Sequence, residues 1–174
     1  MSLYAESKAY LLAKLKEAGV KSKPYTAMKR LEKSQESHVS AVIFDKEAIA
    51  RNGSKKIYED QQGARKKRRK VFDRELTFAV IIGDYSDDTV EALFEKFLES
   101  LDRGIWVNGN FVPIEAEDAE WADEEDSILK ARVAVRVMIT FSGGLYRDTN
   151  FGPLTNIKIE AVQKSNGKEE PING

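Results

Sequence analysis

Residues 70–101 read KVFDRELTFAVIIGDYSDDTVEALFEKFLESL, and this stretch decides the fold. Apolar and polar side chains alternate over 70–82, which predicts a strand with one strongly apolar face. Ser86 is a favourable N-cap, and the apolar residues that follow it recur at helical spacing, which predicts a helix over 87–102. A strand that leads directly into an amphipathic helix indicates that the helix packs on a sheet.

The flanking sequence adds further elements of both kinds. It predicts a helix over 3–18 that ends at Gly19, a short helical turn around 27–33, a strand over 38–44, a hairpin over 105–112 around Asn108-Gly109, a strand over 128–141 that Gly143-Gly144 breaks, and a last strand over 154–162. Pro113 predicts that the second arm of the hairpin is an edge or ends there.

Two charged stretches separate these elements. Residues 46–70 form a long polar excursion in which Ile57 and Tyr58 suggest a short strand, and residues 115–126, eight of twelve acidic, suggest a loop. We therefore expect an α+β fold, a mainly antiparallel β-sheet with two helices on one face plus a β-hairpin and a long charged excursion. It forms one domain over 1–162, followed by a polar tail over 163–174.

Composition excludes several classes of function. The 174 residues include no cysteine and one histidine, His38, so disulfides, thiolate zinc sites and cysteine nucleophiles are excluded. We expect His38 to be structural. No apolar run approaches the ~18 residues of a membrane helix, and the N-terminus lacks the apolar core of a signal peptide, so we expect no membrane association.

Charge is divided sharply along the chain. Residues 1–83 carry 19 basic and 10 acidic side chains, whereas residues 84–174 carry 9 and 19, although the whole chain has a net charge of −1. Opposed halves of this kind pair with each other or present opposite surfaces to neighbouring copies or other partners.

The strongest basic feature is a run of six cations: Arg65, Lys66, Lys67, Arg68, Arg69 and Lys70. By composition it is a solvated surface, a subunit contact or a nucleic-acid patch, and we favour the first two. The predicted helix carries Glu91, Glu95 and Glu99 at i,i+4 spacing, a like-charge stripe that a basic neighbour would relieve. The basic run of the same or an adjacent copy is our candidate for that neighbour.

The acidic segment and the aromatic residues have less distinctive interpretations. Glu117, Asp118 and Glu120 belong to a segment without the ligand order of a calcium loop, so a solvated loop or a contact with a basic surface is favoured over a metal site. No phosphate-binding glycine loop occurs, so we expect no enzyme activity and no cofactor. Trp106, Phe111 and Trp121 are expected to pack in the core, with an exposed interface patch as the alternative.

The order of elements resembles the tail-terminator, or tail-completion, family of long-tailed bacteriophages and prophages. The strings that carry the resemblance are RRKVF at 68–72, FLESL at 97–101 and ITFSGGLYRD at 139–148, together with the acidic segment around Trp121. The resemblance covers about residues 3–148.

The resemblance implies a non-enzymatic virion assembly protein without a cofactor. Such subunits form a ring, usually a hexamer, that caps the tail tube, stops its polymerisation and offers the surface that joins the head. The implied partners are other copies of the chain, the tail tube protein and a head–tail joining protein, with DNA nearby in the lumen, and the implied location is the host cytoplasm during assembly and then the virion tail. By position, the basic run is the candidate lumen or subunit contact, with Glu91, Glu95, Glu99 and the acidic segment as its partners.

Three alternatives stay open at this point. One is another phage structural component, such as a head–tail connector, a tube protein or a baseplate protein. Another is a nucleic-acid-binding protein that uses residues 65–70, which the sequence pI of about 6.0 disfavours. The last is a hydrolase that uses the acidic cluster.

Overall fold

The computed structural model describes residues 1–123 and 133–151. Its elements are α1 (Leu3–Glu17), α2 (Met28–Leu31), β1 (Val39–Arg51), β2 (Lys55–Glu59), β3 (Arg65–Asp84), α3 (Asp87–Ser100), β4 (Gly104–Val107), β5 (Asn110–Asp123) and β6 (Val133–Asn150). They form a six-stranded sheet in the order β1-β3-β6-β5-β4, with β2 also paired to β3. All of the strand pairs are antiparallel. The predicted α+β class is therefore confirmed.

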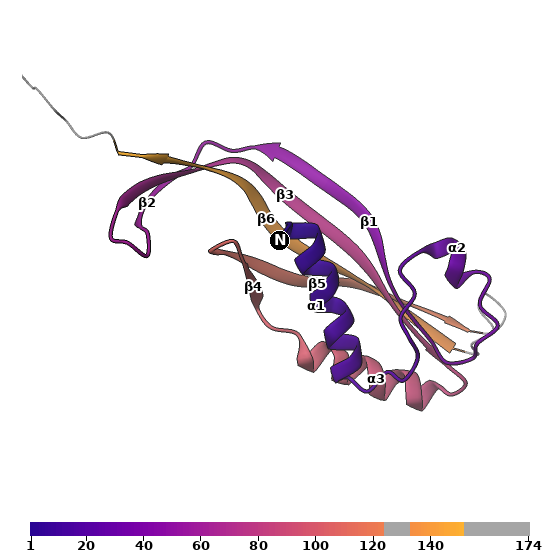
Figure 1. Cartoon of the computed structure of the whole chain (residues 1–174). Coiled ribbons are helices and arrows are strands. Elements are labelled where there is room, and N and C mark those ends of the chain that lie inside the picture. Colours follow the sequence, from indigo (N-terminus) through magenta and orange to yellow (C-terminus); the bar gives the residue numbers. More distant parts are fainter. Residues whose placement is uncertain (124–132, 152–174) are drawn as a thin grey trace, which may run out of the picture.

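The main core lies between one face of the sheet and the two long helices, α1 and α3 (Figure 1). Leu11 and Leu15 of α1 and Phe97 of α3 are fully buried there against Phe78 and Phe141 of the two central strands. The expected pair of helices on one face is thus observed. The alternation over 76–82 places Leu76, Phe78, Val80 and Ile82 on this face. A smaller cluster under α2, formed by Leu31, Val39, Ala41 and Ile81, closes part of the other face.

Hydrogen bonds at the helix ends explain where α1 and α3 begin and where α1 ends. The Ser2 and Ser86 hydroxyls each accept a backbone N–H three residues ahead, both at 3.2 Å. Gly19 follows α1 with φ of +93°, a conformation that glycine adopts without steric cost.

The charged excursion over 46–70 consists largely of paired strands. β1 continues to Arg51, seven residues beyond its expected end, and β3 begins at Arg65 rather than near residue 70. Beyond the end of β1, β2 takes its place beside β3. Backbone hydrogen bonds between strands do not require an apolar side-chain pattern, so the charge of this segment concealed its strands.

The acidic segment is also a strand rather than a loop. β5 runs through Pro113 to Asp123, because Ile114, Ala116 and Ala119 pair in register with apolar residues of β6. A β-bulge at Glu117 and Asp118 shifts this register, so the alternation that marks a strand is interrupted in the sequence. Residues 124–126 of the predicted loop lie outside the described residues.

β6 passes through Gly143-Gly144 without a break and ends at Asn150. A Cβ atom on Gly143 would lie 2.5 Å from Cδ2 of Leu3, and one on Gly144 would meet the Lys70 side chain. These glycines therefore admit neighbouring side chains to the strand instead of ending it. The predicted strand over 154–162, the tail over 163–174 and the first residues of the strand predicted over 128–141 lie outside the described residues.

Candidate assembly surface

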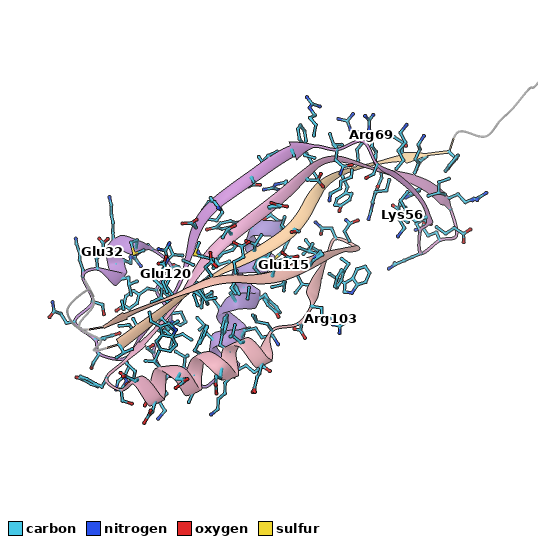
Figure 2. All side chains as sticks on the ribbon, turned by 180° about the vertical axis from the view of Figure 1, so that it is seen from behind. Glu32, Lys56, Arg69, Arg103, Glu115 and Glu120 are labelled. Carbon is cyan, nitrogen blue, oxygen red and sulfur yellow. The ribbon has the colours of Figure 1, made fainter. Side chains whose placement is uncertain are left out.

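The basic run lies in a three-stranded extension of the sheet, which we call the β-arm: β2, Arg65–Lys70 of β3, and Tyr146–Asn150 of β6. It projects beyond the two long helices at one end of the elongated molecule (Figure 1). Because residues 65–70 pair without a bulge, successive side chains point to opposite sides of the arm. Figure 2 shows Arg69 on one side and Lys56, which pairs with Arg68, on the other.

The even-numbered cations are neutralised within the chain. Arg68 donates from Nε and Nη2 to the two carboxylate oxygens of Asp148, each at 2.7 Å, and its guanidinium lies over the Tyr58 ring, 4.7 Å from the centroid. Lys66 is 2.9 Å from Asp60, and Lys70 is 2.5 Å from Asp73. Hydrogen bonds from Arg68 hold the pKa of Asp148 below its usual value, and those from Lys66 and Lys70 do the same for Asp60 and Asp73.

The odd-numbered cations lack such partners. Arg69 stands between Lys55 of β2 and Arg147 of β6, so three cations lie side by side across three strands. All three are exposed. Lys67 lies two residues along β3 on the same side. In the described part of the chain no carboxylate comes within ion-pair distance of these four side chains, which we call the outer cation patch. Arg65 lies two residues before Lys67 on the same side of β3, and it pairs with Glu59 of β2.

The glutamates of α3 form an exposed acidic stripe. Glu91, Glu95 and Glu99 lie on the side of the helix away from its buried residues Val90 and Phe97. α3 runs under the other half of the sheet from the β-arm (Figure 1). Among the described residues no ion pair joins the stripe to the basic run, so the two do not meet within one copy.

The acidic side chains of β5 are only partly engaged. Glu117, Asp118 and Glu120 are all exposed, and Glu120 approaches Arg136 of β6 at 4.0 Å. Arg136 also lies 3.6 Å from Asp45 of β1, so it holds carboxylates from both edges of the sheet. In the described residues no set of three metal-ligating side chains is close enough to hold an ion.

The aromatic residues around the hairpin are not in the core, and the expectation of core packing was wrong. Trp106 is 73% exposed, Phe111 45% and Trp121 49%. Trp106 and Phe111 line a cleft of about 350 Å³ together with Lys56, Arg68, Lys70 and Tyr146 of the β-arm. Trp121 instead packs edge-on against Phe94 of α3, with ring centroids 5.8 Å apart.

One groove has no counterpart in the sequence-based expectations. It measures about 1250 Å³ and lies between the segment after α1, the start of β1 and α3. At its rim, Nδ1 of His38 lies 2.7 Å from a carboxylate oxygen of Asp84, which agrees with a structural role for the histidine. These groups are distant in sequence and form no motif, so no local signal could have revealed the groove.

Comparison with known proteins assigns no family to this chain. No protein-family model matches this sequence, and no curated protein sequence matches it. In the described residues no helix is both long enough and apolar enough to cross a membrane.

Proposed function

We propose that this chain is a non-enzymatic assembly protein of a long-tailed bacteriophage or prophage, whose copies form a ring that ends the tail tube. The observation that carries the proposal is the separation of charge along one elongated subunit: cations on the β-arm that pair with no described carboxylate, and an acidic helix stripe and strand on the other half. The resemblance over residues 3–148 adds the phage context.

The charge separation favours a head-to-tail contact between copies. Opposite charges that cannot meet within one copy can meet between two, and the pair then has one arm and one acidic face left for further neighbours. Head-to-tail contacts close into a ring when the rotation between copies permits, and otherwise they continue as a filament. A closed ring would cap a tube, whereas an open filament would indicate a tube protein.

The proposed partners follow from that role. They are other copies of the chain, the tail tube protein on one side of the ring and a head–tail joining protein on the other. Assembly would take place in the cytoplasm of the bacterial host, and the protein would remain in the virion tail, with DNA passing through the lumen.

The test is the absolute mass in solution, measured by light scattering after size exclusion over a range of protein concentration and salt. We expect a closed species near six times the subunit mass of 19.6 kDa, weakened by high salt because exposed charges carry the contact. Growth without a defined end would contradict the terminator proposal and favour a tube protein. A salt-independent monomer would restrict the proposal to a ring that forms only on the tube.

A further inference from the structure

The two sides of the β-arm differ in a way that the composition of the basic run does not show. On one side Lys66, Arg68 and Lys70 pair with Asp60, Asp148 and Asp73, whereas on the other side no carboxylate among the described residues pairs with the outer cation patch. Like charges directly opposite one another on neighbouring strands are destabilising. Repulsion among Lys55, Arg69 and Arg147 therefore destabilises the arm of the free subunit, and an anionic partner would relieve this repulsion.

From this arrangement we infer that the outer cation patch docks on the α3 glutamate stripe of a second copy. This inference rests on the proposed self-assembly, and it specifies which two surfaces meet between neighbouring copies. The surface is the outer side of the arm around Lys67 and Arg69, and the occupant is the helix side that carries Glu91 and Glu95.

The spacing of the charges on the two surfaces agrees. Side chains two residues apart on one side of a strand are separated by about 6.7 Å, so Arg65, Lys67 and Arg69 extend over about 13 Å. Residues four apart on a helix are separated by about 6 Å, so Glu91, Glu95 and Glu99 extend over about 12 Å. A helix laid along β3 would therefore bring each carboxylate close to a cation, with Lys55 and Arg147 on either side.

The exposure of both surfaces permits this contact without unfolding either one. The stripe lies away from the buried side of α3, and Lys96, the one cation of this helix, neighbours Glu99 at i,i+3 spacing but neither Glu91 nor Glu95. The patch side chains are likewise exposed or half-buried. Because α3 and the arm of one copy are at different ends of the molecule, the contact joins two copies (Figures 1 and 2).

A nucleic-acid backbone is the competing polyanion, and the charge of the rest of the molecule disfavours it. The net charge of −1 and the acidic half would repel phosphates that approach the arm. In the contact between copies, that same acidic half supplies the partner.

Complementary charge reversal tests the inference. The arm variant is Lys67→Glu with Arg69→Glu, and the helix variant is Glu91→Lys with Glu95→Lys. Each variant alone brings like charges together at every contact, so we expect the apparent dissociation constant for self-association to rise at least about tenfold. A 1:1 mixture restores opposite charges at both kinds of contact in an alternating ring, so we expect the mixture to recover the wild-type mass.

Lys29→Glu with Lys33→Glu is the matched control, because it makes the same change in net charge at exposed positions around α2. We expect it to assemble as the wild-type protein does. Recovery in the mixture also shows that both variants are folded, so loss of assembly in each variant alone does not reflect misfolding.

Four results would overturn the inference. Wild-type assembly that neither variant weakens would place the contact elsewhere and leave the ring proposal intact. A mixture that does not recover would show that the two surfaces are not partners. Binding of a duplex oligonucleotide, followed by fluorescence anisotropy and lost only in the arm variant while assembly is unchanged, would assign the patch to nucleic acid. If the wild-type protein is monomeric throughout, the contact does not form between free copies, and binding to tail tubes then tests the function separately.

Discussion

Replacing Gly143 by alanine tests why β6 carries a glycine opposite Leu3. The new Cβ would lie 2.5 Å from Cδ2 and 3.0 Å from Cδ1 of Leu3, which is 6% exposed at the start of α1. Real Cβ atoms do not approach carbon so closely, so Leu3 must move. We therefore expect Gly143→Ala to alter the contact between α1 and the sheet.

The magnitude follows from two opposing effects. Overpacking costs about 1–3 kcal/mol, and the lower entropy of the unfolded chain with alanine returns about 0.4–1 kcal/mol. The difference between these two effects gives an expected net loss of about 1 kcal/mol in the free energy of unfolding. Leu3→Ala alone, which leaves a cavity, should cost about 2 kcal/mol.

The double variant separates this explanation from a general strand effect. Leu3→Ala removes the three atoms nearest to the added Cβ, so Gly143→Ala should become neutral or slightly stabilising in the Leu3→Ala background. We expect a coupling of about 1–1.5 kcal/mol between the two sites. Urea unfolding followed by circular dichroism measures all four proteins. Additive losses would refute the steric reasoning and indicate that glycine is needed for backbone reasons.

Three further predictions concern the arm, the hairpin and the core. Hydrogen bonds from Arg68 hold the folded-state pKa of Asp148 below its ordinary value of 3.8, so their stabilisation is present above that pH and is lost as the pH falls below it. Amide exchange should therefore show that protection of the arm falls there, and the Asp148→Asn variant should lack this pH dependence. Trp106→Ala should change the free energy of unfolding by no more than about 0.5 kcal/mol because the ring is largely exposed, and a larger loss in urea unfolding would contradict its placement. Phe97→Ala should cost about 3–5 kcal/mol by the same assay, since the ring is fully buried between α3 and the sheet, and a loss under 1 kcal/mol would refute that packing.

The fold class was predictable because its core elements have strong apolar periodicity. Residues 76–82 and 90–101 each bury one face, and the period of two or 3.6 is visible in the sequence. The outer part of the sheet was less predictable, since Arg65–Lys70 and Lys55–Glu59 are held by cross-strand pairing of charged residues that leaves no apolar pattern. The continuity of β6 at Gly143 depends on its pairing with Arg74 of β3, which is distant in sequence.

The candidate site was predictable in composition but not in arrangement. The run 65–70 and the stripe on α3 are evident in the sequence, but the division of the run into paired and unpaired sides requires knowing that it is a regular strand. The carboxylates of Asp60, Asp73 and Asp148 that neutralise one side come from a turn, from β3 and from β6. Trp106 is exposed because it lies on the side of the hairpin opposite Val107 and Val112, which pack in the core.

The bulged acidic strand β5 has a consequence for how copies can meet. β4 pairs only with its first residues, so in the described part of the molecule the edge from Ile114 onward has no neighbouring strand. A bare edge invites another chain to add a strand, and such addition has no natural end. The irregular register at Glu117 and Asp118, and the negative charge beside it, oppose that addition. These features oppose ribbon-like aggregation through added strands. Copies can then associate only through side-chain contacts, and the rotation between neighbouring copies sets how many of them form one assembly.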